Sequence, residues 1–319
     1  MTTPTGKIGL VTPGQGCQFV GMGADIVGKY PEARRLFEQA DDILGFSLSR
    51  LCFEGPKEML DETVNTQPAI YVATCALWQV IAPRMESVRE RITLTAGHSM
   101  GEFAALTIAG ALDFADGVRL MRCRGEAMRD AGALAPGSMA AIIGLDDNTV
   151  HALVDEASNG GPGVWVANYN SPGQVVIAGE QAGVERALAL ARERGAKRLV
   201  PLAVSVAAHT PLMRGAVERL SAFLEQISLR RPWIAVINNA TAIPTDDPTA
   251  IKSALLRQLA SPVRWVESIR LMIERGVTTI LEVGPRAVVS GLNKRIAPEA
   301  TLRDVTDVAS IESFATEGL

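Results

Sequence analysis

Residues 97–101 read Gly-His-Ser-Met-Gly, a serine with a glycine two positions away on either side. A β-rich run at 93–96 leads into this segment, and a helical pattern follows it at 102–109. The two glycines allow the sharp, strained turn that lifts a serine hydroxyl out of a fold. The free N–H groups and positive dipole at the start of the next helix favour the oxyanion that forms when serine attacks a carbonyl. The pattern therefore predicts that Ser99 is a nucleophile.

A serine nucleophile needs a general base, and the chain has three histidines, His98, His151 and His209. His98 directly precedes Ser99, so its side chain leaves the turn in another direction and is interpreted as structural. His151 lies in a helical segment behind an acidic cap and is predicted to be a surface residue. His209 ends an extended apolar stretch, and a proline two residues later opens the next helix. Elimination and this strand-to-helix position predict His209 as the base, and a structural loop histidine is the alternative.

The composition is typical of a globular enzyme, with 319 residues, 47% of them hydrophobic and 21% charged. This length can bury one large core and a small additional unit. The net charge of −4 argues against a nucleic-acid partner. The N-terminal residues lack the apolar core of a signal peptide, and no stretch is long and apolar enough to span a bilayer. We expect a cytoplasmic monomer that makes no membrane contact.

The four cysteines have no spacing typical of a metal site and lie in apolar surroundings, so we expect reduced core thiols and no bound metal. These cysteines are Cys17, Cys52, Cys75 and Cys123.

The predicted elements mostly alternate between strand and helix, as in α/β folds. Apart from the segment around Ser99, we expect strands at 8–12, 234–237 and 278–283, and helices at 24–44, 67–80, 114–133, 211–226, 251–259, 263–275 and 287–296. The strand at 278–283 and the helix at 287–296 are predicted to be the last elements of the chain.

The order of the predicted elements changes after Ala135-Pro136-Gly137, a Pro-Gly pair that is typical of a break between elements. Strands are predicted at 138–145, 164–168, 174–178 and 198–202, and helices at 148–157 and 181–194. This βαββαβ order is the ferredoxin-like pattern. We therefore predict a small ferredoxin-like domain, residues 137–203, inserted into a large α/β catalytic domain, residues 1–136 and 204–319.

Eight motifs stand in order along the chain and together resemble one family. They are GQGCQ at 14–18, GHSMGE at 97–102, RGEAM at 124–128, GSMAAIIG at 137–144, NSPGQVVIAG at 170–179, HTPLM at 209–213, QLASPVRW at 258–265 and EVGP at 282–285. The chain resembles the malonyl-CoA:acyl carrier protein transacylases, either of the fatty-acid type or of the free-standing polyketide type. The resemblance implies an α/β-hydrolase-like large domain with a ferredoxin-like insert, in agreement with the order of the elements.

The resemblance also implies roles for the residues of a catalytic site. Ser99 would take the acyl group as an ester, with His209 as general base and then general acid. The family works without a triad aspartate, so a neutral carbonyl at Gln258, from the main chain, would orient His209. The backbone N–H groups of Gln15 and Met100 would form the oxyanion hole, and the glycines that flank Gln15 would let its backbone approach the substrate.

Three further residues are implied to contact the substrate. Arg124 would bind the free carboxylate of malonate in a bidentate manner. On spacing alone Arg124 would be a surface arginine, because its helix carries several others, but the match at 124–128 reverses that interpretation. Asn168 and Asn170 lie near the junction of the two domains and are weaker candidates, for which capping of a loop is an equal alternative.

Two positions depart from the pattern of the family. Cys17 stands where serine is usual; a small buried residue is the simpler interpretation, and a modifiable thiol near the cleft is the other. Residues 206–208 read Val-Ala-Ala. This is neither His-Ala-Phe nor Tyr-Ala-Ser, the triplets associated with malonyl and methylmalonyl selection in modular polyketide acyltransferases. Because Ala208 is small, the sequence does not predict the exclusion of substituted malonyl groups.

The resemblance implies a ping-pong reaction in which malonyl-CoA acylates Ser99, CoA leaves, and the phosphopantetheine thiol of an acyl carrier protein attacks the ester. No metal or bound cofactor is expected, since CoA arrives with the substrate. Two other functions stay open, an acyl hydrolase that edits carrier-protein thioesters and a non-catalytic docking subunit. A hydrolase of neutral chains would leave Arg124 without a partner, and the presence of Ser99, His209 and Gln15 argues against a docking subunit.

Carrier proteins of this kind are acidic, so docking to a chain of net charge −4 needs a local basic patch. The small domain offers the Arg192 cluster, which consists of Arg192, Arg194, Lys197 and Arg198. The predicted helix at 287–296 and the residue before it offer the Arg286 cluster, which consists of Arg286, Lys294 and Arg295. For each cluster, the alternative interpretation is a charged helix face that is exposed to solvent and binds no partner.

Overall fold

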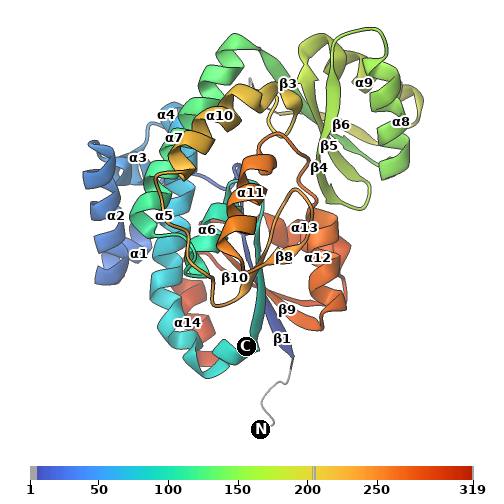
Figure 1. Cartoon of the computed structure of the whole chain (residues 1–319). Helices are drawn as coiled ribbons and strands as arrows, with labels where there is room; N and C mark the ends of the chain where they lie inside the picture. The colour runs from blue at the N-terminus through green and yellow to red at the C-terminus, as the bar shows by residue number, and fades with distance from the viewer. Residues whose placement is uncertain (1–5, 203, 205, 318–319) are drawn as a thin grey trace.

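The structure is a computed structural model that describes residues 6–202, 204 and 206–317 (Figure 1). Within these residues the named strands form two sheets, one of six strands and one of four. In Figure 1 the four-stranded sheet and its two helices stand to the upper right of the larger part. The predicted α/β class with a second, smaller sheet is confirmed.

The six-stranded sheet has the order β10-β9-β1-β2-β7-β8, and its strands are parallel except for β8. The strands are β1 Lys7–Thr12, β2 Ile92–Gly97, β7 Ala235–Ile237, β8 Pro244–Thr245, β9 Val277–Val283 and β10 Thr301–Val305. The central strands are buried almost throughout, because helices cover both faces of the sheet.

Successive residues of the central strands point to opposite layers of helices. Leu10 and Leu281 belong to the core beneath α5 and α6, whereas Val11 and Ile280 belong to the core beneath α12. The helices that share the core of Leu10 and Leu281 are α1 Ala24–Lys29, α2 Pro31–Leu44, α3 Leu48–Glu54, α4 Lys57–Asp61, α5 Thr63–Ile81, α6 Gly101–Ile108, α7 Phe114–Leu134, α10 Arg214–Leu224, α11 Pro248–Gln258 and α14 Val308–Glu317. Two helices, α12 Trp265–Glu274 and α13 Val289–Ile296, cover the other face.

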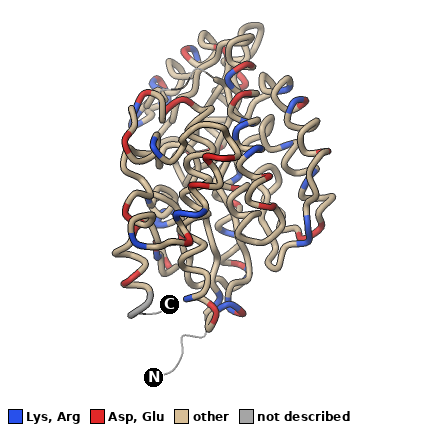
Figure 2. The backbone as a smooth tube through the Cα atoms, turned by 90° about the vertical axis from the view of Figure 1, so that its left-hand side faces the viewer, with Lys and Arg blue, Asp and Glu red and all other residues tan. Residues whose placement is uncertain are grey.

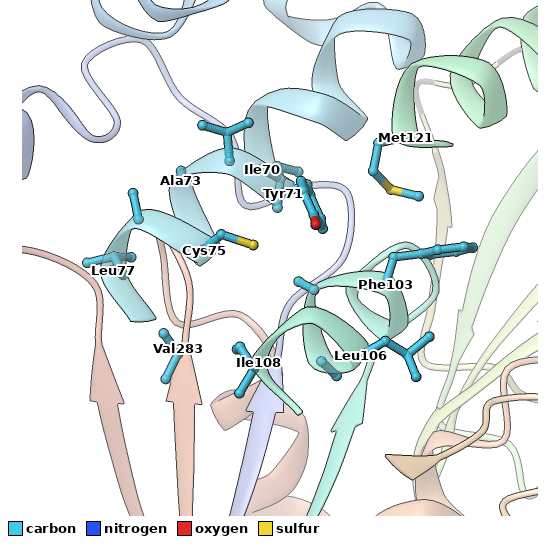
Figure 3. Close-up of a cluster of buried hydrophobic side chains, with 14 of the residues drawn as sticks. Ile70, Tyr71, Ala73, Cys75, Leu77, Phe103, Leu106, Ile108, Met121 and Val283 are labelled. Atoms are coloured by element: carbon cyan, nitrogen blue, oxygen red, sulfur yellow. The ribbon is translucent and has the colours of Figure 1, made fainter. Parts of the chain in front are cut away.

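Helix α5 is buried almost all round, as expected for a helix that is apolar on every side. Figure 3 shows Tyr71 and Cys75 of α5 in the same cluster as Phe103 and Ile108 of α6, above the strands of the sheet. The Tyr71 hydroxyl lies 2.7 Å from Thr107 Oγ1 and is thereby hydrogen-bonded within the core. None of the helices in the described part of the chain combines the length and apolar character needed to cross a membrane.

The four-stranded sheet is antiparallel, with the order β4-β5-β3-β6. Its elements are β3 Gly137–Ile143, α8 Asp147–Ser158, β4 Val164–Ser171, β5 Gln174–Glu180, α9 Gln181–Glu193 and β6 Arg198–Pro201. Helices α8 and α9 cover one face, and the other face packs against α7 of the larger part. The predicted βαββαβ order is confirmed. The proposed small domain, 137–203, ends on a residue that lies outside the described ones.

Several predicted elements differ from the observed ones. The predicted helix at 24–44 is two helices, because Tyr30 is extended and Pro31 starts α2. The helix predicted to begin at 67 begins at Thr63, and Pro68 lies inside it. A short 3-10 helix, η1 Ala82–Arg91, follows it, and another, η2 Pro211–Met213, precedes α10.

The prediction that the chain ends with the helix at 287–296 is wrong, because β10 and α14 follow α13. Strand β10 is at the edge of the sheet, and most of its side chains are exposed or half-buried. An edge strand of this kind lacks the continuous apolar run by which the central strands were predicted.

Candidate active site

Ser99 stands on the turn between β2 and α6 with a φ of 52°, a left-handed conformation that is uncommon for a residue with a side chain. The turn is tight enough that a Cβ on Gly97 would lie 2.0 Å from the carbonyl carbon of Gly101. Glycine at 97 is therefore a steric requirement of the turn. The predicted strand, turn and helix around the serine are all present.

The Ser99 hydroxyl contacts the histidine that the sequence predicts as its base. Ser99 Oγ lies 2.7 Å from His209 Nε2, and His209 Nδ1 lies 2.9 Å from the main-chain oxygen of Gln258. A carbonyl oxygen can only accept a hydrogen bond, so Nδ1 carries the proton and Nε2 is left as the acceptor for the serine. The arrangement is a serine–histidine pair oriented by a neutral carbonyl.

His209 is almost wholly buried, at a φ of 64°. Burial, reinforced by the nearby charge of Arg124, lowers the pKa of His209 to about 3. Because the histidine is a cation when protonated, a lowered pKa means that its neutral form is present throughout the neutral pH range. The neutral form is the one that can accept a proton from serine.

The loop after β1 lies directly against the serine turn. The N–H of His98 donates to the Thr12 oxygen over 3.0 Å, and a Cβ on Gly14 would lie 2.6 Å from the His98 oxygen. This close approach places Gln15 beside the turn. Among the described residues, the backbone N–H groups of Gln15 and Met100 donate no hydrogen bond to another group.

Arg124 is 1% exposed, in contrast to Arg119 and Arg129 of the same helix, which are exposed. Its Nη1 donates to Gln67 Oε1 over 2.8 Å. Its Nη2 donates to Gln258 Oε1 and, more weakly, to Ser99 Oγ, over 3.2 and 3.3 Å. The Arg124 Nε is buried and has no partner among the described residues. Burial lowers the pKa of Arg124 to about 10, which still leaves a cation at neutral pH.

Two side chains hold the serine turn, that of Asn239, which the sequence did not single out, and that of Gln258, for which only the main-chain carbonyl was expected to act. Asn239 Oδ1 accepts from the Ser99 N–H over 2.6 Å, and Gln258 Nε2 donates to the Ser99 oxygen over 2.8 Å. Gln67, which bonds Arg124, is a second residue that the sequence did not single out. The only signal for these residues is a polar side chain at the end of a strand or inside an apolar helix, which also has many structural causes.

Asn168 and Asn170 lie in strand β4, so the loop-capping alternative is wrong. Asn168 is buried, and its main chain forms a single parallel β-bridge with Val263. This bridge connects β4 to the larger part of the molecule. Asn170 Oδ1 lies 2.8 Å from His98 Nε2, and the His98 ring packs edge-on against Trp265. His98 is therefore structural in its contacts, and Asn170 borders the serine turn.

Comparison with known proteins agrees with this geometry. The family model for the acyl transferase domain matches residues 10–315. The malonyl CoA-acyl carrier protein transacylase of Haemophilus influenzae is 45% identical over 307 residues, which make up 96% of this chain and 97% of that protein. The chain belongs to the malonyl-CoA:acyl carrier protein transacylase family.

Solved structures of this transacylase family have the same fold. An acyl carrier protein S-malonyltransferase from Vibrio cholerae is 42% identical, with a TM-score of 0.91 over 96% of this chain and 99% of that one. A malonyl-transacylase solved in complex with a type II PKS acyl-carrier protein is 41% identical, with a TM-score of 0.92 over 98% of this chain and 100% of that one.

Two further residues named from the sequence lie outside the transacylase site. His151 is exposed on α8 and is hydrogen-bonded to the Tyr169 hydroxyl, as expected of a surface residue. Cys17 is wholly buried, and burial raises the pKa of its thiol, so the reactive thiolate is disfavoured. Cys17 therefore fits the interpretation of a small packed residue and not that of a modifiable thiol.

Proposed function

We propose that the chain transfers a malonyl group from malonyl-CoA to the phosphopantetheine thiol of an acyl carrier protein, through an ester on Ser99. The observation that carries this proposal is a serine–histidine pair directly beside a buried arginine whose Nε has no hydrogen-bond partner within the part of the chain that the structure describes. The names of the relatives support the same donor and acceptor. Since CoA esters are large and charged, we place the reaction in the cytoplasm with the CoA pool.

In the first half-reaction Ser99 Oγ attacks the thioester carbonyl carbon while its proton passes to His209 Nε2. The new C–O bond pushes the carbonyl electron pair onto oxygen, where the N–H groups of Gln15 and Met100 stabilise it. When the carbonyl re-forms, the C–S bond breaks, and the sulfur takes the electron pair and the proton held by His209. CoA leaves as a thiol, and Ser99 carries the malonyl ester.

The second half-reaction runs the same steps on a different thiol. The phosphopantetheine thiol gives its proton to His209, and its sulfur attacks the ester carbonyl. The C–O bond of the ester then breaks, and Ser99 Oγ regains the proton from His209. Ser99, His209 and the two thiols account for every bond and proton in these steps, which involve no metal and no bound cofactor.

Arg124 would hold the free carboxylate of the malonyl group. Its Nε and Nη2 lie on one edge of the guanidinium and can meet both oxygens of a carboxylate. No described residue bonds the Nε, and the Nη2 contact to Ser99 Oγ is long at 3.3 Å. An acetyl group would offer no carboxylate to this buried cation, so the site should prefer malonyl donors.

Carboxylate binding would also make His209 a stronger base. The Arg124 charge contributes to the lowered pKa of His209. A bound carboxylate compensates that charge, so the pKa of His209 should rise when malonyl-CoA occupies the site. Malonyl-CoA would thus help to activate the serine that it acylates, and acetyl-CoA would not.

The release of CoA in the absence of carrier protein tests this function. On rapid mixing with malonyl-CoA we expect a burst of about one CoA per enzyme molecule, because acylation does not need the acceptor. The Ser99→Ala variant should give no burst. Release of CoA only after carrier protein is added would contradict the two-step reaction, and continuous release without it would indicate a hydrolase.

A further inference from the structure

Glu102 is a buried carboxyl group that the proposed reaction does not use. It lies on the first turn of α6, three residues after Ser99, and is 2% exposed. One of its oxygens, Oε2, accepts two hydrogen bonds, from the Asn239 N–H over 3.1 Å and from Gln258 Nε2 over 2.8 Å. Glu102 therefore joins two segments distant in sequence directly beneath the serine turn.

The first segment, at Asn239 after strand β7, clamps the turn from both sides. Its Oδ1 accepts from the Ser99 N–H over 2.6 Å, and its Nδ2 donates to the Gly97 oxygen over 2.7 Å. The main chain of Asn239 is in turn held by Glu102. The strained φ of Ser99 is thus maintained by a side chain that Glu102 anchors.

The second segment, at the end of α11, presents Gln258 to three parts of the site. The Gln258 Nε2 donates to Glu102 Oε2 and to the Ser99 oxygen, over 2.8 Å in each case. Since the amide nitrogen faces these two acceptors, the amide oxygen must face the other way, toward Arg124 Nη2 at 3.2 Å. The amide would present a donor to the guanidinium if it were reversed.

We propose that Glu102 is a positioning residue that, through Gln258 and Asn239, fixes the Arg124 guanidinium relative to Ser99 and so determines the preference for malonyl over acetyl donors. This inference rests on the proposed role of Arg124. Burial raises the pKa of Glu102 to about 7, but a carboxyl group in either protonation state has an oxygen that accepts. The geometry of its acceptor matters here, and its charge does not.

Three substitutions separate the geometry of Glu102 from its charge. Glu102→Ala removes the acceptor, Glu102→Gln keeps a carbonyl oxygen at the place of Oε2 without the charge, and Glu102→Asp keeps the charge but withdraws it by one carbon–carbon bond. The measurement is the ratio of the Ser99 acylation rates with malonyl-CoA and acetyl-CoA, without carrier protein. We expect the ratio to fall about tenfold or more in the alanine and aspartate variants and to stay within about threefold in the glutamine variant.

Glu282→Ala is the matched control. Glu282 is also wholly buried and bonds backbone N–H groups at the start of α13, for example that of Val289 over 3.1 Å, but it lies outside this network. Its removal should lower stability and leave the malonyl-to-acetyl ratio unchanged. If the Glu102→Ala protein does not fold, the aspartate and glutamine variants decide, because geometry and charge predict opposite orders for them.

The outcomes separate this inference from the proposed function. If Arg124→Ala loses the malonyl preference while Glu102→Ala and Glu102→Asp keep it, the positioning role is overturned and the proposed function stands. A glutamine variant that loses the preference while the aspartate variant keeps it would also overturn the inference, in favour of a role for charge. If Arg124→Ala itself keeps the preference, the proposed role of Arg124 fails.

Discussion

Among the residues of the site, a neutral imidazole at His209 and a cation at Arg124 both contact the Ser99 hydroxyl. Burial disfavours the charged form of each, but the lowered pKa of about 3 keeps His209 neutral, whereas that of about 10 leaves Arg124 charged. A neutral base and a cationic anion-binding group can therefore both contact the same serine. As a consequence, a substrate carboxylate that binds Arg124 should also change the pKa of His209, and with it the transfer of the Ser99 proton.

Arg124→Ala should reduce malonyl transfer and raise acetyl transfer relative to it. A charge-assisted bidentate pair in a buried site is worth about 3–5 kcal/mol, so malonyl acylation should fall by about two to nearly four orders of magnitude. Steady-state kinetics with both donors measure this. Arg122→Ala is the control, because Arg122 pairs with Glu126 nearer the surface of the same helix. An equal loss on both donors would make Arg124 structural.

At malonyl-CoA concentrations far below saturation, where the rate reports the pKa of the free enzyme, the rate of Ser99 acylation should change little between pH 8 and pH 5. A histidine of ordinary pKa would be about 3% neutral at pH 5 and would lose about thirtyfold in rate, whereas a pKa near 3 leaves His209 neutral. The profile is measured by rapid quench in the wild type and in Glu102→Gln, which removes the carboxyl that contacts Gln258 and whose pKa burial raises to about 7. Loss of rate in both proteins with an apparent pKa near 6.5 would contradict the environment assigned to His209.

At the scale of elements, the site forms where β1, β2 and β7 end and where α6 and α11 meet them. Parallel strands bring their carboxyl ends to one edge of the sheet, so the Gln15 loop, the Ser99 turn and Asn239 all arise there. Helix α11 adds Gln258 at its C-terminus, and its start is capped by Asp247, which accepts from the Ala250 N–H over 2.7 Å.

Gly97→Ala should damage both the fold and the activity. A Cβ at this position would lie 2.0 Å from backbone atoms, which a side-chain rotation cannot relieve, so we expect a loss of at least about 2 kcal/mol of unfolding free energy. Gly28→Ala in α1 is the control, since nothing lies near its Cβ and alanine favours the helix. Denaturant unfolding with an acylation assay measures the effect; unchanged stability of Gly97→Ala would refute the tight turn.

Sequence patterns predicted those parts of the molecule that carry a strong local signal. The Gly-x-Ser-x-Gly turn needs both of its glycines, and the elements from 138 to 202 show clear periods of strand and helix. Glu102, Asn239 and Gln67 act through contacts that form only when distant segments meet, so a single polar residue gave no indication of its role. Strand β10 was missed because pairing with β9, and not an apolar run, makes it a strand.

At the scale of the whole molecule, charges of both signs are interspersed along the backbone (Figure 2), and the net charge is −4. Carrier-protein docking must therefore depend on local groups. In the Arg286 cluster, Lys294 and Arg295 are exposed on the last turn of α13, a helix that packs beside β4. In the Arg192 cluster, Arg194 already pairs with Glu156. This ion pair makes the Arg192 cluster the weaker candidate.

Reversing Lys294 and Arg295 to glutamate should raise the KM for carrier protein by about tenfold, while acylation by malonyl-CoA stays near normal. Added salt should reduce the difference, because exposed charges are screened. The same reversal at Arg34 and Arg35 of α2, on the opposite side of Figure 1, is the control. The two half-reactions are measured separately. If the α13 reversal leaves carrier-protein kinetics unchanged, docking uses another surface.

The central claim, that Ser99 carries the malonyl group between donor and acceptor, is tested most directly by peptide mass spectrometry after incubation with malonyl-CoA alone. We predict a malonyl ester on the peptide that contains Ser99, its disappearance when carrier protein is added, and its absence from the Ser99→Ala protein. A malonyl adduct on another residue, or transfer by Ser99→Ala at a normal rate, would contradict the account.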